Sequence, residues 1–180
     1  MQRSALIILI SLISLMFFTY SEAASKAEID IKTDAALARF KTEVDVADAF
    51  LNRAAGVLVF PSVIKAGFGI GGEYGEGALR VGGETTGYYS TAAASIGFQL
   101  GAQTKTVILI FLESAALKSF QDSDGWEVGV DGSVALIELG TGASVDTTNI
   151  KDPVIGFVLN NKGLMYNLTL EGSKITRLNK

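Results

Sequence analysis

Apolar residues recur every three or four positions in the segment that precedes the first glycine. They are Leu37, Phe40, Val44, Ala47, Leu51 and Ala54. This spacing puts them on one face of an α-helix, with Thr33 or Asp34 as candidate caps at its start and Gly56 after its end. The pattern predicts a helix packed on its own domain. A helix lying on a membrane is the alternative, although four acids and three bases between Asp34 and Arg53 do not make the basic face of such helices.

The hydrophobic pattern changes at Gly56, where the first of 20 glycines stands. Short alternating or continuous apolar runs follow, separated by turn residues such as Gly82-Gly83 and Asp131-Gly132, which is typical of antiparallel strands. The run TVILIFL is apolar throughout and suits a strand covered on both faces. ESAALKSFQ predicts a short internal helix. The expected fold is α+β, a mostly antiparallel barrel-like or strongly curved sheet of about nine or ten strands with an N-terminal amphipathic helix.

The segment GFGIGGEYGEG, residues 67–77, contains the G-x-G-x-x-G fingerprint of dinucleotide-binding folds. In those folds the glycines lie between a strand and a helix whose N-terminus binds the pyrophosphate. Here three further glycines and two glutamates lie within or directly after the fingerprint, which disfavours both a helix and a phosphate. The sequence therefore predicts an extended strand and no bound nucleotide.

Glycines alternate with large apolar residues in this predicted strand. Gly67, Gly69 and Gly71 would share one face, and Phe68 and Ile70 the other. A face without side chains allows a backbone or a flat ligand to come close, and it allows a sharp bend. Sheet curvature and packing explain such glycines well, and a groove for an acyl chain is the more specific alternative.

The first 23 residues have the features of a signal peptide. Arg3 gives a basic start, Ala5 to Phe18 is apolar apart from two serines, and Ser21 and Ala23 supply small residues for cleavage after Ala23. An uncleaved anchor is the alternative, but the apolar run is shorter than a membrane span. We expect residues 24–180 to form one exported domain, periplasmic or secreted, helical over 24–55 and mainly β over 56–180.

The composition argues against most catalytic chemistry. The chain has no histidine and no cysteine, which removes histidine acid–base catalysis, cysteine nucleophiles and the usual zinc ligands. We therefore expect no enzyme, cofactor or metal, and the net charge of −4 makes nucleic acid an unsuitable partner. A hydrolase that uses Glu73 and Glu76 as an acid pair remains an alternative.

Several long segments resemble the SYLF domain family, in particular its bacterial branch with a signal peptide. The segments are AAGVLVFPSVIKAGFGIGGEYGEGALR, GYYSTAAASIGFQLGAQTKTVILIFL, GWEVGVDGSVAL and NKGLMYNLTLEGSKITRL. The resemblance extends from about Asp34 to Leu178 and implies non-catalytic lipid binding. Eukaryotic relatives are associated with phosphoinositide-containing membranes and fungal ones with actin, which an exported bacterial protein would not meet.

The resemblance attributes membrane contact to an amphipathic N-terminal helix and nearby basic residues. The matching positions here are Leu37, Phe40, Val44 and Leu51 on the predicted helix, and Lys65. We expect a phospholipid or fatty acid as ligand, a membrane surface as a further partner, and Phe68, Ile70, Tyr88, Tyr89 and Trp126 as candidate lining of an apolar groove. The alternative is a structural or protein-interaction module of the cell envelope.

Overall fold

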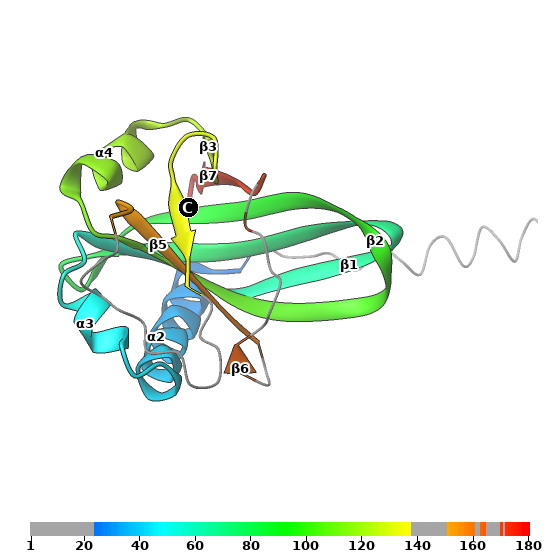
Figure 1. The fold of residues 1–180 in the computed structure, drawn as a ribbon, viewed down its shortest axis with the longest axis horizontal. Coiled ribbons are helices and arrows are strands. Elements are labelled where there is room, and N and C mark those ends of the chain that lie inside the picture. Colours follow the sequence, from blue (N-terminus) through cyan, green and yellow to red (C-terminus); the bar gives the residue numbers. More distant parts are fainter. Residues whose placement is uncertain (1–23, 138–150, 161–162, 165–169, 171) are drawn as a thin grey trace, which may run out of the picture.

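The structure is a computed structural model that describes residues 24–137, 151–160, 163–164, 170 and 172–180. Two helices, α2 (Lys26–Glu43) and α3 (Ala47–Leu51), precede the long strands β1 (Gly56–Val81) and β2 (Glu84–Phe111). Then follow α4 (Ser114–Asp122), β3 (Trp126–Glu127), β4 (Val134–Leu136), β5 (Val154–Asn160), β6 (Gly163–Leu164) and β7 (Lys174–Leu178). Figure 1 shows the helices gathered at one end and the long strands projecting from it. The fold is α+β, as predicted.

Strands β1 and β2 form one antiparallel hairpin that is much longer than an ordinary strand pair. Their register runs from Gly56↔Phe111 to Val81↔Glu84. Gly82 and Gly83 connect them with φ angles of 61° and 89°, the left-handed conformation that a type I′ turn requires at both positions. The predicted Gly82-Gly83 turn is therefore confirmed.

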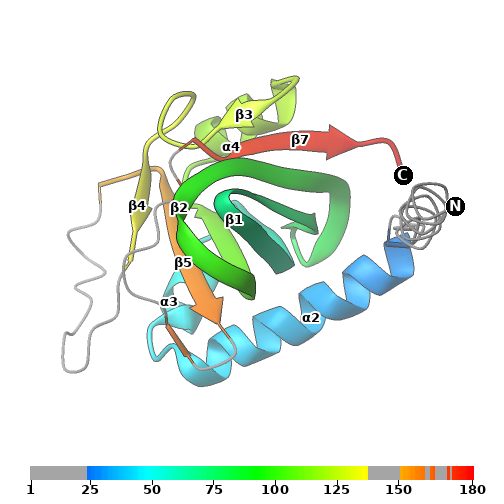
Figure 2. The same ribbon diagram turned by 90° about the vertical axis from the view of Figure 1, so that its right-hand side faces the viewer.

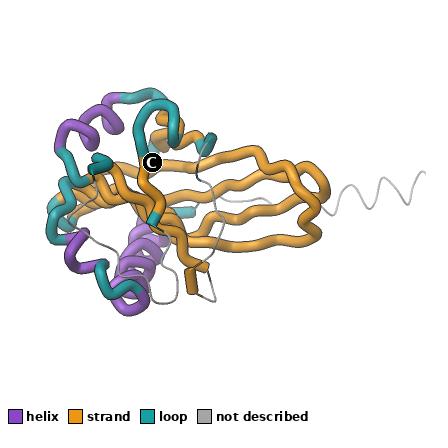
Figure 3. The backbone as a smooth tube through the Cα atoms, in the orientation of Figure 1, coloured by secondary structure: helices purple, strands orange, loops and turns teal. Residues whose placement is uncertain are grey.

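This hairpin folds back on itself. A Cβ atom on Gly77 would lie 2.1 Å from the carbonyl oxygen of Val59, and one on Gly75 would lie 2.8 Å from that of Ser62. Because all of these residues belong to β1, the two halves of a single strand must face each other. Figures 1 and 3 show both strands running away from the helices and returning, and Figure 2 shows the resulting curl end-on.

The glycine-rich segment lies in the strand and not in a phosphate-binding loop. Residues 67–77 are all part of β1, and the Gly82-Gly83 turn leads into another strand. The register with β2 shifts between Gly67 and Gly69, in the part of β1 where the strand reverses direction. The prediction of an extended, bent strand is confirmed, and the dinucleotide fingerprint has no strand–helix context here.

The expected number of nine or ten strands was too high for the described residues, which form one sheet of seven strands. The mostly antiparallel arrangement is confirmed, with β4 and β5 as the one parallel pair among these strands. Six of the predicted runs merge into β1 and β2, because the glycines and Pro61 mark bends and register shifts within a strand instead of its end. The predicted strand LMYNLTL lies largely outside the described residues.

The turn predicted at Asp131-Gly132 is also not the turn of a two-stranded hairpin. Gly129 already has a positive φ of 85°, and the Asp131 carboxylate accepts a hydrogen bond from the Glu127 N–H at 2.7 Å. The chain therefore closes a compact loop before it reaches β4. Strand β3 pairs with β7 and β4 with β5, so the two strands have different partners.

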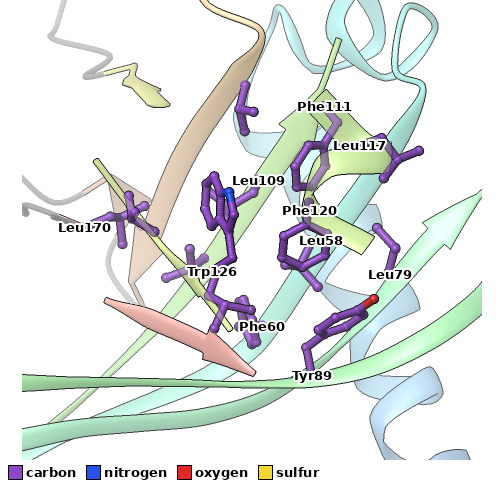
Figure 4. Close-up of a cluster of buried hydrophobic side chains, with 14 of the residues drawn as sticks. Leu58, Phe60, Leu79, Tyr89, Leu109, Phe111, Leu117, Phe120, Trp126 and Leu170 are labelled. Atoms are coloured by element: carbon purple, nitrogen blue, oxygen red, sulfur yellow. The ribbon is translucent and has the colours of Figure 1, made fainter. Parts of the chain in front are cut away.

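Apolar side chains are buried on both faces of the sheet near the helices. Leu58 and Phe60 point into the curl, where α4 covers them, whereas Val57 and Val59 face α2 and α3. Residues 107–111 are all at most 4% exposed, which confirms the prediction for TVILIFL. Figure 4 shows the inner cluster with Phe111, Phe120 and Trp126 among its labelled side chains.

The N-terminal helix has the predicted apolar face but different ends. It begins after Ser25, whose hydroxyl accepts a hydrogen bond from the Glu28 N–H, so Thr33 and Asp34 are interior positions and not caps. It ends at Glu43, because the weak helix formers Val44, Asp45 and Val46 interrupt it. The break lets Phe40 and Phe50 both pack against Phe157, whose ring centroid lies 4.7 Å from that of Phe40 and 5.6 Å from that of Phe50.

Candidate functional site: a groove between the helices and the hairpin turn

A cavity of about 350 Å³ lies between α2, the end of α3 and the turn that joins β1 to β2. Its apolar lining comes from Leu37, Leu51, Ala54 and Val57, and its charged lining from Asp34, Lys41 and Arg80. The apolar residues are buried or half-buried, whereas Asp34 and Lys41 are exposed. The groove therefore combines an apolar interior with charged groups at its rim.

The local sequence explains how these elements leave a groove. Leu37 and Lys41 are four residues apart on α2, so they lie on one side of the helix. Gly82 and Gly83 line the opposite side, and a Cβ atom on either glycine would have no atom within 4 Å. Because the type I′ turn requires positive φ angles, glycines occupy it. The groove is therefore bordered by residues without side chains at this point.

Arg80 is the most buried charged group of the groove. Its Nη2 atom lies 2.7 Å from Asp34 Oδ1 and 3.6 Å from Asp30 Oδ1. The Arg80 side chain is 16% exposed, whereas that of Asp34 is 69% exposed. The second cation, Lys41, lies 3.5 Å from Asp48 in an exposed ion pair. Both cations of the groove therefore have a carboxylate partner.

Asp30 anchors α2 to the end of the hairpin. Its carboxylate accepts hydrogen bonds from Thr85 Oγ1 at 2.7 Å and from the Tyr88 hydroxyl at 2.8 Å. Burial raises the pKa of Asp30, but the hydrogen bonds from Thr85 and Tyr88, together with the Arg80 charge, outweigh it and leave the pKa below the ordinary value of 3.8. Burial and the bond to Asp30 raise the pKa of Tyr88.

We expect Asp30→Asn to remove part of the acid sensitivity of folding. Because the folded-state pKa of Asp30 lies below its unfolded value, ionised Asp30 contributes stability above the unfolded pKa, and this stability is lost as the pH falls through the folded pKa. Urea unfolding at a series of pH values below about 4 gives the free energy of unfolding as a function of pH. This free energy should fall less steeply with decreasing pH in Asp30→Asn than in the wild type, and Thr85→Val should also make the fall less steep. An equally steep fall in Asp30→Asn and the wild type would contradict this role.

The structure brings only some of the predicted lining residues together. Leu37 and Leu51 both line the groove, but Phe40 and Val44 are fully buried between α2 and the sheet. Tyr88 belongs to the Asp30 cluster, close to the groove residue Arg80. The predicted helix face is thus divided between the groove and the core.

Other predicted site residues lie inside the curl of the sheet. Tyr89 and Trp126 are each 3% exposed, and their ring centroids lie 4.9 and 5.7 Å from that of Phe120. In this conformation they fill the core and do not border the groove. Gly67, Gly69 and Gly71 lie in the backbone of β1, and the side chains of Phe68 and Ile70 are outside the described part of the structure.

Lys65 belongs to a layer of charges between the two halves of the folded hairpin. Its Nζ atom lies 3.4 Å from Glu73 Oε1, and Lys105 Nζ lies 2.5 Å from Glu73 Oε2. The Lys105 side chain is 5% exposed, and its contact is ionic without the direction of a good hydrogen bond. Glu76 pairs similarly with Lys180 at 3.0 Å. Both glutamates of the alternative hydrolase, Glu73 and Glu76, therefore form ion pairs with lysines.

Arg80 was not predicted as a groove residue. In the sequence it is a single base at the end of an apolar run, and no periodicity connects it to Asp34, which is 46 positions away. The signal available was the position of this base two residues before a predicted turn. A cation next to a tight turn lies at the end of a hairpin, where a helix can cover it.

The structure adds two findings about other kinds of site. Within the described ranges, no three acidic side chains gather in a way that would hold a metal ion. No helix in those ranges is both long enough and apolar enough to cross a membrane.

Comparison with known proteins identifies the family. The family model described as Ysc84, Las17-binding protein actin regulator, matches residues 92–180. The match covers most of β2 and all the described elements that follow, whereas the groove residues lie before it. No curated protein matches the chain. Over residues 92–180, the chain therefore belongs to the SYLF domain family.

Proposed function

We propose that this protein is a non-catalytic lipid-binding protein of the cell envelope, and that the groove receives a phospholipid or a fatty acid. The observation that carries the proposal is the combination of Leu37, Leu51, Ala54 and Val57 with Lys41 and Arg80 around one cavity. Apolar walls favour an acyl chain, and the cations favour the oxyanion that a lipid carries beside it.

The size of the groove limits how much of a lipid it can enclose. Small-molecule sites range from about 300 to 1,000 Å³, and this cavity of about 350 Å³ is at the lower end. It suits the region where an acyl chain meets its charged group, and the remaining chain would stay in a membrane or along the protein surface. A membrane surface therefore belongs to the proposal as the source of the ligand.

The proposed location is outside the cytoplasm. It rests on the signal-peptide features of residues 1–23. The family description names binding to Las17 and regulation of actin, but an exported protein would not meet cytoskeletal partners. We therefore propose lipid, and not actin, as the partner of this chain.

Leu37→Glu is expected to weaken lipid binding about 10-fold or more, because it replaces an apolar wall whose contact with a chain contributes about 1.5–3 kcal/mol. Residues 24–180 would be mixed with phosphatidylglycerol vesicles and separated by flotation. The matched control is Ile31→Glu, which lies on the same helix but is 70% exposed and does not line the groove. Thermal unfolding of both variants shows whether each is folded.

The two substitutions distinguish the groove from general adhesion of the helix. If Ile31→Glu weakens binding as much as Leu37→Glu does, the helix surface and not the groove binds the membrane. If neither variant differs from the wild type, the groove is not the lipid site. Mass spectrometry of the purified protein adds an independent readout, since stoichiometric lipid supports the proposal and its absence speaks against it.

A structural or protein-interaction module of the envelope is the second candidate. The inner face of the sheet near α4 is filled by side chains, and Ile64 and Tyr74 are 50% and 52% exposed on β1. A protein partner that covered these two side chains would be the interaction that this second candidate requires. Ile64→Ser with Tyr74→Ser should disrupt such a complex while leaving vesicle binding unchanged.

A further inference from the structure

Arg80 has two carboxylate partners that are held very differently. Asp30 is fixed by hydrogen bonds from Thr85 and Tyr88 and is part-buried. Asp34 contacts Arg80 Nη2 at 2.7 Å, but its side chain is 69% exposed. Water around the exposed Asp34 carboxylate screens this ion pair and solvates the carboxylate when it leaves. Asp30 therefore holds Arg80 in place, whereas Asp34 can be exchanged at little cost.

The exchangeable contact lies within the groove. Asp34, Arg80 and Lys41 all line the cavity, so the carboxylate of Asp34 is bound where an oxyanion of a ligand would bind. A guanidinium group presents several N–H donors in one plane and binds a phosphate or a carboxylate equally well in geometric terms. Asp34 thus has the chemistry of a substitute ligand supplied by the protein itself.

We propose that Asp34 is a built-in competitor that occupies Arg80 until an oxyanion on an apolar chain displaces it. The inference rests on the proposed function, because it assigns the charged end of the lipid to Arg80. The shared chemistry is an oxygen anion, either the phosphate of a head group or the carboxylate of a fatty acid. Asp34 is a specificity-determining residue, since it sets which anions bind.

The charge balance explains the selectivity. Arg80 with Asp30 and Asp34 has one positive and two negative charges, so the cluster as a whole does not attract anions. A free inorganic anion that displaces Asp34 gains a contact with Arg80, but Asp34 loses an equivalent contact, so the exchange by itself releases little free energy. A lipid anion also buries apolar surface against Leu37 and Leu51, and this additional free energy drives the exchange. The groove should therefore bind anions with apolar chains and not free anions.

The test compares Asp34→Asn with Asp45→Asn, which removes the same charge from an exposed position near the end of α2. Asp34→Asn should bind phosphatidylglycerol vesicles about 2- to 5-fold more tightly than the wild type, the factor that corresponds to an exposed ion pair. Asp45→Asn should match the wild type. The gain should disappear in Arg80→Gln with Asp34→Asn, provided that thermal unfolding shows a folded protein.

Three further probes separate the sources of the anion. Micromolar oleate should displace phosphatidylglycerol from the wild type if Arg80 takes the carboxylate of a fatty acid, and it should leave phosphatidylglycerol bound if Arg80 takes only the phosphate of a head group. With phosphatidylcholine vesicles, Asp34→Asn should show a smaller increase in affinity over the wild type, because the phosphatidylcholine head group has no net charge. Inorganic phosphate at millimolar concentration should not displace phosphatidylglycerol from the wild type. Displacement by phosphate would overturn the requirement for an apolar chain.

The outcomes separate this inference from the proposed function. If phosphatidylglycerol binds and Leu37→Glu weakens it, but Asp34→Asn equals the wild type or Asp45→Asn shows the same gain, the competitor role is wrong and lipid binding stands. If no vesicle binds to the wild type or to Asp34→Asn, both the proposed function and the competitor role are wrong.

Discussion

Gly77→Ala is expected to destabilise the protein by about 3 kcal/mol or more. The added methyl group would lie 2.1 Å from the carbonyl oxygen of Val59 and 2.8 Å from its carbonyl carbon. These are backbone atoms of the opposite half of β1, so no side-chain rotation can relieve the overlap. The two halves would have to separate, which would open the inner core. Urea unfolding followed by the fluorescence of Trp126, the single tryptophan, would measure the loss.

Gly72→Ala is the matched control for this prediction. It lies in the same strand, but the nearest atom to its Cβ would be Ala93 O at 3.7 Å, an ordinary contact. Its free energy of unfolding should stay within about 0.5 kcal/mol of the wild type, as for most surface substitutions. Equal effects at Gly77 and Gly72 would show that the fold-back of β1 does not require a glycine at position 77.

Glu73→Gln is expected to cost about 3–5 kcal/mol of stability, the range for removing one partner of a buried ion pair. The substitution leaves Lys105, which is 5% exposed, and the half-buried Lys65 without their shared carboxylate. An uncompensated ammonium group inside the folded hairpin loses its hydration without an opposite charge in return. Denaturant unfolding of Glu73→Gln against the wild type measures this loss.

Two variants show whether the cost comes from the buried charge. Glu84→Gln removes an exposed carboxylate from the hairpin and should change stability by less than about 0.5 kcal/mol. Adding Lys105→Met to Glu73→Gln removes the buried charge and should restore most of the stability, because no uncompensated ammonium group of Lys105 then remains inside the hairpin. Failure of the double variant to recover would indicate that Glu73 acts by another contact.

Several parts of the fold could be predicted because they depend on neighbours in the sequence. The stripe from Leu37 to Ala54 is buried or half-buried as expected, although Val44 to Val46 interrupt the helix. The continuous apolar run at residues 107–111 is buried on both faces. The Gly82-Gly83 turn has the positive φ angles that its dipeptide favours. Each of these features follows from local periodicity or backbone freedom, which a single segment contains.

The candidate site was only partly predictable. Leu37 and Leu51 belong to the apolar stripe and do line the groove, but the same stripe places Phe40 and Val44 in the core. The sequence pattern shows that a face is apolar, and it does not show whether a protein core or a ligand covers it. Tyr89 and Trp126 illustrate the same limit, because their amphipathic character suits a wet boundary while the structure buries them against Phe120.

The sequence alone determined the element types: a two-faced helix, glycine-rich strands, a tight turn and the absence of histidine and cysteine chemistry. Only the tertiary structure decided which of these meet. The reversal of β1 brings Gly77 to Val59 and Glu73 to Lys105, and the crossing of α2 over the hairpin brings Asp34 to Arg80. The physical reason is that periodicity records the environment of a residue, whereas its partners depend on how strands bend and how helices cross, which distant residues control.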